Sequence, residues 1–408
     1  MHDPRLGRFL WLYPIAVAGA FVAFLPLLSV ALPLRAEAIA GQGKILLLSQ
    51  ALIVGVSVAT VANIAAGMAS DWTRVRFGTR APWLWLGLAG MWVGYAAVAA
   101  ATSAPGLIVG VALFQLGFNA LFAPLGALLP DSVPDRLKGR VAALSNLALP
   151  AGSLAAAMIG LPLFASDTLR IMVPGALATM LLLPILIVRT APRDAADRAV
   201  PEEAGIRWSA FRSLWGAKFL VQLSGSVMTG YFLFYLQDGL GYARRYPGES
   251  AQSGFAQVII VATAATAIVS LALGRWSDRI ARRKPFLIAG IAAMGAGLAL
   301  LALQANWASV LIGYTAFATG LGAFLTIDAA LVAQILPSPR HRGRDLGLMN
   351  AANTVPAILG PLAALLALDG LRSDYRMLFG LLLVALTLSA ALVAITRIPG
   401  DSVTPTPR

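Results

Sequence analysis

The chain has 408 residues, of which 59% are hydrophobic and 12% are charged, and its formal net charge is +13. Soluble domains carry roughly 25% charged residues, so this composition excludes a soluble globular protein and indicates an integral membrane protein. The basic residues lie in short turns between apolar runs, where the positive-inside rule explains them better than nucleic-acid binding does. The chain has no cysteine, which excludes disulfides and thiol chemistry.

About twelve apolar runs are long enough to cross a bilayer as a helix, which needs about 20 residues. In chain order we expect these spans near residues 9–34, 45–70, 82–102, 106–129, 141–164, 169–188, 219–236, 253–276, 285–303, 307–336, 346–368 and 375–395. The first run is too long for the core of a signal peptide, so we expect it to be retained. With both termini in the cytoplasm, 24 of the 31 Lys and Arg residues fall on that side, which predicts this orientation.

The composition changes at the midpoint of the chain, where residues 190–212 mix both charges with Pro, Ala and Gly. We interpret this segment as a cytoplasmic linker. The predicted fold class is an all-α membrane protein with twelve transmembrane helices in two pseudo-symmetric six-helix bundles, residues 1–189 and 213–397. We expect the polar tail, residues 398–408, to be disordered.

Two short motifs occur once in each half. Gly67 begins GMASDWTRVRFGTRAP and Gly274 begins GRWSDRIARRKP, so each copy reads Gly, two residues, Ser, Asp, a basic cluster and Pro. A second pair reads Leu-Pro, a basic turn, Gly-Arg, and then an Asn six residues beyond the Arg, at Asn146 and Asn350. Paired motifs at corresponding positions predict a duplicated bundle.

With these paired motifs, the twelve spans and the central linker, the chain resembles the major facilitator superfamily over essentially its whole length. The resemblance implies the two-bundle fold and transport by alternating access. The long form of the first motif is similar to the glycoside–pentoside–hexuronide carrier branch, which includes melibiose- and sucrose-type symporters. The residues that carry this similarity are Thr73, Arg74, Arg76, Gly78 and Pro82.

One departure from that branch concerns the coupling cation. Melibiose-type carriers bind it with two carboxylates four residues apart on the second span, and the corresponding positions here are about Ala59 and Asn63. On the fourth span, where the branch has another acid, the nearest polar residue is Asn119. Sodium coupling by that arrangement is therefore not expected. Because the chain also has no nucleotide-binding motif, we expect proton coupling.

The resemblance also implies a cytoplasmic gate at the first pair of motifs. By analogy, Asp71 would face the start of the eleventh span and Asp278 the start of the fifth span, where helix N-termini carry partial positive charge. The basic residues that would add charge-assisted hydrogen bonds between the halves are Arg74, Arg76, Arg279 and Arg282. The competing interpretation is that these charges only set the topology at a membrane edge.

Asp328 lies inside the tenth span, about two and a half turns before Pro337. A charged group at that depth costs several kcal/mol unless it faces a cavity or has a partner. It is either a proton-coupling or substrate-binding carboxylate, or a structural carboxylate bonded to a neighbouring helix. No Lys, Arg or His is an obvious partner inside a predicted span, which favours a protonatable acid.

Neutral polar side chains within the spans are candidates to line a substrate cavity, although interhelical hydrogen bonds are their commonest use. The candidates are Asn63, Gln115, Asn119, Asn146, Tyr231, Tyr235, Gln257, Asn350 and Asn353. Tyr231 and Tyr235 are one turn apart and share a helix face. Paired aromatics near amides would suit a hydroxylated ring, and apolar packing explains them nearly as well.

These observations predict a proton-coupled secondary transporter of the cytoplasmic (inner) membrane that moves a small solute, with a sugar or glycoside favoured by the branch resemblance. We expect a monomer whose partners are the solute, the proton and the lipid bilayer, with no nucleic acid, cofactor or metal. One alternative is a drug or lipid exporter, because NLALPAGSLAAA partly resembles the glycine-rich element that such exporters carry in the fifth span. The other is a membrane-embedded enzyme, for which no catalytic cluster is visible: both histidines, His2 and His341, lie in polar segments.

Overall fold

The computed structural model describes residues 4–133, 137, 141, 144–145, 147–161, 166–187, 208–280, 283–303, 306–335, 342–368 and 374–396. The chain divides into two compact units. The first comprises Met1–Asp197 with Tyr246–Ala256, and the second comprises Arg198–Arg245 with Gln257–Arg408.

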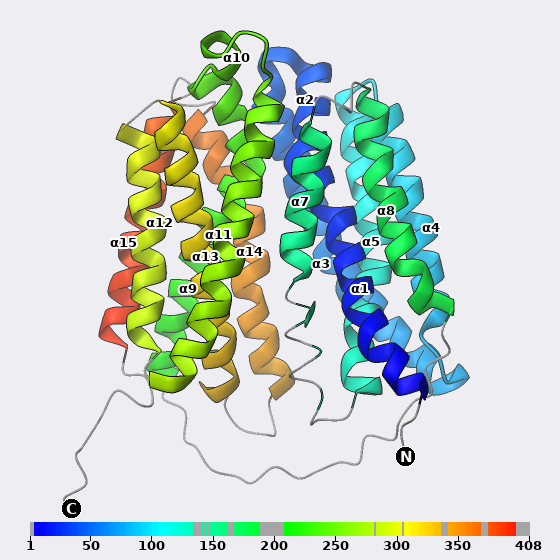
Figure 1. Cartoon of the computed structure of the whole chain (residues 1–408). Helices are drawn as coiled ribbons and strands as arrows, with labels where there is room; N and C mark the ends of the chain where they lie inside the picture. Colours follow the sequence, from blue (N-terminus) through cyan, green and yellow to red (C-terminus); the bar gives the residue numbers. More distant parts are fainter. Residues whose placement is uncertain are drawn as a thin grey trace, which may run out of the picture. The chain divides into compact units, whose positions relative to one another are not determined.

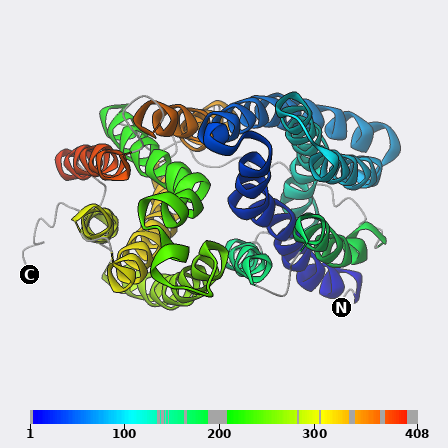
Figure 2. The same ribbon diagram turned by 90° about the horizontal axis from the view of Figure 1, so that it is seen from above.

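All regular structure in the described residues is helical (Figure 1). Before the midpoint the elements are α1 (Pro4–Pro26), the π-helix η1 (Leu27–Ala31), α2 (Leu32–Ala40), the 3-10 helix η2 (Gly41–Gly43), α3 (Lys44–Phe77), α4 (Ala81–Ala100), α5 (Ala104–Ser132), α7 (Ala148–Gly160) and α8 (Asp167–Ile187). After it they are α9 (Trp208–Phe234), the π-helix η3 (Tyr235–Gly239), α10 (Tyr242–Arg245), α11 (Ala251–Ile280), α12 (Lys284–Leu303), α13 (Trp307–Ile335), α14 (Arg342–Leu368) and α15 (Tyr375–Ile395). Figure 2 shows many of these helices nearly end-on.

Ten segments of the described residues are long and apolar enough to cross a membrane. The first, Leu6–Phe77, contains the turn at Gly41, whose φ of 54° favours glycine, so it corresponds to the first two predicted spans. The fifth predicted span is described as a helix only from Ala148 to Gly160. The chain is therefore a multi-pass, all-helical membrane protein, as predicted, while the number of twelve spans and the cytoplasmic termini stay predictions.

Two helices extend beyond the boundaries expected from the sequence. Helix α3 continues past residue 70 to Phe77, so Asp71, Arg74 and Arg76 lie on its last two turns and not in an interhelical turn. Helix α9 begins at Trp208, inside the predicted linker, and it therefore contains Lys218. In both cases the helix continues through polar residues, because hydrogen bonding along the backbone does not stop where the apolar run ends. Of the rest of the predicted linker, residues 190–207 lie outside the described residues.

Helices α4 and α5 approach so closely that their backbones touch (Figure 1). A Cβ atom at Gly94 would overlap the backbone of Phe114, and a Cβ atom at Gly117 would overlap the backbone of Gly90 and Met91. Any larger side chain at Gly94 or Gly117 would push the helices apart. Small residues of this kind are the usual means of close packing between membrane helices.

The same arrangement recurs between α12 and α13 in the second unit. A Cβ atom at Gly297 would overlap the carbonyl of Gly313, and one at Gly320 would overlap the carbonyl of Gly290. Pro82 lies in the first turn of α4, and Pro285 lies in the first turn of α12. Gly297 and Gly320 follow Pro285 at the same distances along the chain as Gly94 and Gly117 follow Pro82. The duplication seen in the motifs therefore extends to the packing of the helices.

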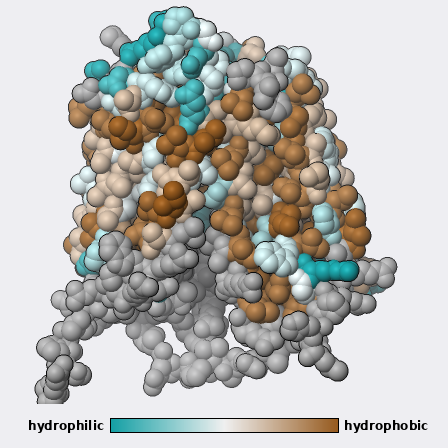
Figure 3. All heavy atoms as spheres, in the orientation of Figure 1, coloured by the Kyte–Doolittle hydropathy of each residue, from teal (hydrophilic) through white to brown (hydrophobic). Residues whose placement is uncertain are grey.

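The outer surface suits a hydrocarbon environment. Large apolar side chains such as Val61, Met180 and Leu303 are exposed on the helix flanks. Figure 3 shows hydrophobic residues over the sides of the helices and hydrophilic residues gathered at the end where α10 lies. This is the pattern of a protein whose flanks face lipid and whose helix ends face water.

Candidate functional site

The turn between α3 and α4 places Arg80 between the ends of two helices. Gly78 ends α3 with a left-handed φ of 71°, and its N–H donates to the carbonyl of Arg74. The Thr79 hydroxyl accepts from the N–H of Ala81 at 3.1 Å, and α4 starts there with Pro82 in its first turn. Because the connection has only residues 78–80, the Arg80 side chain folds back toward the end of α3.

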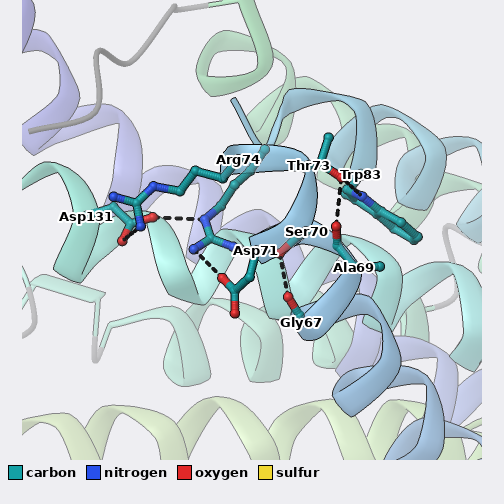
Figure 4. Close-up of polar contacts among 9 residues, drawn as sticks. Gly67, Ala69, Ser70, Asp71, Thr73, Arg74, Trp83 and Asp131 are labelled. Carbon is teal, nitrogen blue, oxygen red and sulfur yellow. Dashed lines mark hydrogen bonds and ion pairs between the residues drawn. The ribbon is translucent and has the colours of Figure 1, made fainter. Parts of the chain in front are cut away.

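Asp71, Arg74, Arg80 and Asp131 form an ion-pair cluster, which we call the α3 cluster. Asp71, Arg74 and Asp131 are labelled in Figure 4, and Arg80 is the centre of the cluster. Its Nη2 lies 2.6 Å from Oδ1 of Asp71, and its Nε lies 2.8 Å from Oδ2 of Asp131. Its Nη1 donates to the hydroxyl of Ser70 at 2.6 Å. Arg74 Nη1 lies 2.8 Å from Oδ1 of Asp131, so Asp131 at the end of α5 bridges two arginines.

The members of the α3 cluster differ strongly in burial. The side chain of Arg80 is 5% exposed and that of Asp131 is 16% exposed, whereas that of Asp71 is 67% exposed. Burial lowers the pKa of Arg80, but hydrogen bonds and charge from Asp131 and Asp71 outweigh it and raise the pKa above its ordinary value. Arg80 is therefore a permanent cation, and Asp131 is its more buried counter-charge.

The predicted gate residues are only partly described. Asp71 and Arg74 have partners within the first unit, and the guanidinium of Arg76 lies over the rings of Trp72 and Phe77 at 5.6 and 5.7 Å. Asp278 and Arg279 lie on α11, but their side chains, like the whole of Arg282, are outside the described residues. A latch between the halves stays a prediction.

Sequence reasoning missed Arg80 and Asp131. Arg80 lies two residues before Pro82 in the first motif, and Asp131 directly follows the Leu-Pro that begins the first copy of the second motif. The available signal was a basic residue and an acidic residue, each at the end of a predicted span. Such a pair could have been tested as an ion pair.

A buried ion pair joins α9 to α13 in the second unit. Lys218 Nζ lies 2.7 Å from Oδ2 of Asp328, and the two side chains are 11% and 7% exposed. The expectation that Asp328 has no cationic partner is therefore wrong. Lys218 lies just before the predicted seventh span, residues 219–236, whereas α9 begins at Trp208 and therefore includes it.

Lys218 is the first of three polar residues on one face of α9, Lys218, Gln222 and Ser226, which we call the polar stripe. Gln222, one turn further on, donates from Nε2 to Oδ1 of Asn353 on α14 at 3.1 Å. A Cβ atom at Gly360 of α14 would approach the hydroxyl of Ser226, the next residue of the stripe, within 2.7 Å. The three polar residues share one helix face because they are spaced four apart, and Gln222 and Ser226 face α14.

A second polar group joins α3 to α5 in the first unit. Asn63 donates from Nδ2 to Oδ1 of Asn119 at 3.1 Å. Asn119 donates from Nδ2 to the carbonyl of Gln115 at 2.8 Å and to its Oε1 at 3.3 Å. The three cavity candidates Asn63, Gln115 and Asn119 are thus one connected amide cluster, in which Gln115 and Asn119 are buried.

The remaining cavity candidates are dispersed. The ring of Tyr235 packs against Tyr375 and Phe379, and its hydroxyl donates to the carbonyl of Leu301 at 3.4 Å, so this tyrosine faces α12 and α15. Tyr231 is buried and Gln257 is exposed. Two candidates, Asn146 and the side chain of Asn350, lie outside the described residues.

Residues 214–408 match the family model described as Major Facilitator Superfamily. A curated relative, the "Uncharacterized MFS-type transporter YfiU" of Bacillus subtilis (strain 168), is 36% identical over 89 residues, which are 22% of this chain and 17% of the relative's length. The YfiU match spans far less than two thirds of that relative.

Solved structures are similar to this chain in fold over nearly its whole length. A bacterial homologue of the human lysosomal transporter Spinster, in an inward-facing and occupied conformation, aligns with a TM-score of 0.70 over 97% of both chains, at 14% identity. The nucleoside transporter NupG, as a D323A mutant, aligns with a TM-score of 0.69 over 95% of this chain and 100% of its own, at 13% identity. Identities this low show a common fold and nothing about substrate.

Proposed function

We propose that this protein is a member of the major facilitator superfamily and a proton-coupled secondary transporter, which moves a small solute across the cytoplasmic membrane by alternating access. The observation that carries the proposal is the buried ion pair of Lys218 and Asp328. Charges inside membrane helices are expensive and mark substrate, ion or proton pathways. A buried pair also adds little to stability compared with apolar packing, which favours a working role over a structural one.

In this proposal Asp328 carries the proton. Deprotonated, its carboxylate holds Lys218 at 2.7 Å and ties α13 to α9. Protonation removes the negative charge and with it the ion pair, so α9 and α13 are joined by charge in one protonation state only. Two states that differ in this contact are what coupling requires, because a ligand shifts an equilibrium only through its different affinity for the two states.

The amide cluster and the polar stripe support a hydroxylated solute. Side-chain amides offer both donors and acceptors, which match the hydroxyl groups of a sugar or glycoside. The resemblance to the glycoside–pentoside–hexuronide branch favours the same class. A nucleoside is itself a glycoside, so the name of the NupG neighbour fits within it. We propose Asn63 and Asn119 of the first unit as contacts for such a solute.

The α3 cluster has a separate part in the proposal. Arg80 and Asp131 hold the end of α3 to the end of α5, and Arg80 fixes the position of the exposed Asp71. Asp71 is thereby available for the proposed latch between the halves, with Asp278 as its counterpart. In this proposal the exposed carboxylate of Asp71 forms the latch, and the buried residues Arg80 and Asp131 hold it in position.

One observation favours an amphiphile exporter as the second candidate. Phe114, Phe118 and Phe122 stack along one face of α5, with ring centroids 5.7 and 5.3 Å apart. Phe24 of α1 stacks on Phe118 at 4.9 Å, and Phe21 meets Phe122 edge-on at 6.2 Å. Such an aromatic row would suit an apolar or amphiphilic solute as well as it suits packing.

Proteoliposomes that contain a pH-sensitive dye test the proposal. Sugars, nucleosides and amphiphiles are added in turn, and solute uptake and internal pH are recorded together. Uptake of a hydroxylated solute with proton movement supports the first candidate, and transport of amphiphiles alone supports the second. Uptake with no change in pH would remove the proton coupling, and failure with all three classes would remove the proposed solute classes.

A further inference from the structure

Arg35 lies at the opposite end of α4 from the α3 cluster. Its Nη2 donates to the carbonyl of Ala99 at 2.6 Å, in the last turn of α4, where carbonyl groups lack partners within the helix. Helix α4 has 20 residues and is therefore about 30 Å long, which is about the thickness of the hydrocarbon core of a bilayer. Arg80 and Arg35 therefore lie at opposite ends of a helix whose length matches that core, and we expect lipid headgroups near both ends.

Arg170, in the first turn of α8, lines the same cavity as Arg35 of α2. Its Nη1 is 3.7 Å from Oδ1 of Asp167, a distance too long for a hydrogen bond. A cation in the first turn also opposes the helix dipole, which favours negative charge there. Arg170 and Asp167 are therefore an ion pair in which these two atoms make no hydrogen bond.

Both arginines have a buried donor that is unused among the described residues. The Nε–H groups of Arg35 and Arg170 make no hydrogen bond there. Both side chains line one cavity of about 10 Å³, together with Ala31, Leu34, Asp167 and Ile171. That volume is close to the smallest that holds one water-sized group. Buried, charged donors without acceptors are costly, so the cavity calls for an acceptor.

We propose that Arg35 and Arg170 form an anion site that takes one oxygen atom of a phosphate group. Two guanidinium groups face a single carboxylate, Asp167, so the cavity is net positive and an anionic oxygen would neutralise it. The planar donors of arginine suit phosphate oxygens, and the N-terminus of α8 adds partial positive charge of its own. The phosphate belongs either to a phospholipid headgroup or to free inorganic phosphate, and the site does not depend on the solute or on proton coupling.

Thermal unfolding of the purified full-length protein in detergent tests the site. One arm titrates dioleoyl phosphatidylglycerol against dioleoyl phosphatidylcholine, and the other titrates sodium phosphate against sodium chloride at equal ionic strength. The variants are Arg170→Gln, which removes the charge, and Arg170→Lys, which keeps the charge and removes the Nε–H. The matched control is Arg244→Gln, an exposed arginine of α10.

We expect the wild type to melt at a higher temperature with phosphatidylglycerol or with phosphate than with the matched control ligand. The concentration that gives half of this effect should rise at least tenfold in Arg170→Gln, should rise in Arg170→Lys as well, and should not change in Arg244→Gln. Stabilisation by the lipid alone identifies a headgroup site, and stabilisation by inorganic phosphate identifies a free-anion site. The proposal is overturned if neither ligand stabilises the wild type, or if the Arg170 and Arg244 variants respond alike.

Discussion

Removal of both charges of the Lys218–Asp328 pair should be far less damaging to folding than removal of one. At 2.7 Å the attraction between the two charges is about 6 kcal/mol at an effective dielectric constant of about 20, and the loss of hydration of both groups offsets much of it. Lys218→Met or Asp328→Asn alone leaves a buried charge without its partner, which should destabilise the protein by about 3–5 kcal/mol. The double variant has no buried charge and should melt close to the wild type.

The matched control is a second Lys–carboxylate pair of nearly the same length. Lys44 Nζ lies 2.8 Å from Oε1 of Glu37, but the side chain of Glu37 is 37% exposed. The side chain of Lys44 is only 10% exposed, so the suitable control is Lys44→Met, which leaves the more exposed Glu37 unpaired. Solvent screens that carboxylate, so we expect this variant to change the free energy of unfolding by less than about 1 kcal/mol. Thermal unfolding of all variants in one detergent compares the two pairs directly.

Transport separates a coupling pair from a structural one. The Lys218→Met/Asp328→Asn double variant, reconstituted in proteoliposomes, should exchange solute down its gradient without solute-linked proton movement, because no group at this position binds the proton. Proton movement at the wild-type ratio in the folded double variant would refute the coupling role of Asp328. Equal melting of the single and double variants would refute the electrostatic reasoning itself.

Five further substitutions probe other parts of the fold and the site. Asp131→Asn should lower the free energy of unfolding by about 2–3 kcal/mol, because two arginines lose a charged acceptor, whereas Asp71→Asn should leave melting nearly unchanged and lower the rate of solute uptake. Gly117→Ala should destabilise the protein by about 1–3 kcal/mol through overpacking against α4, while Gly126→Ala, which has open space around it, should melt like the wild type. Asn119→Ala should weaken solute uptake in proteoliposomes with the fold retained, and unchanged uptake kinetics would remove the amide cluster from the solute site.

The sequence predicts the helical class and most helix positions well, since apolar runs of about 20 residues have few alternatives in a bilayer. It predicts helix ends less well where polar residues continue a helix, as in the last two turns of α3 and the first turns of α9. The second error concealed Lys218, because it lies one residue before the predicted start of the seventh span and was not considered as a partner inside a span for Asp328. The ion pair depends on tertiary packing of α9 against α13, which no local pattern encodes.

The candidate site shows the same division. Asn63 and Asn119 were selected separately as polar residues inside spans, and the structure joins them by a hydrogen bond. Arg80 and Asp131 were not selected, because their roles arise only when the ends of α3, α4 and α5 meet. Polar residues can be found from their place in apolar segments, but their partners follow from the fold.

The glycine contacts within the α4–α5 and α12–α13 pairs restrict which helices can change position during a working cycle. Two helices whose backbones touch cannot slide or tilt against each other without steric collision, so each pair moves as one rigid unit. Asn119 lies in the α4–α5 pair, and Asp328 lies in the α12–α13 pair. Any local rearrangement around these side chains must therefore come from the opposing helices, α3 and α9, which carry Asn63 and Lys218.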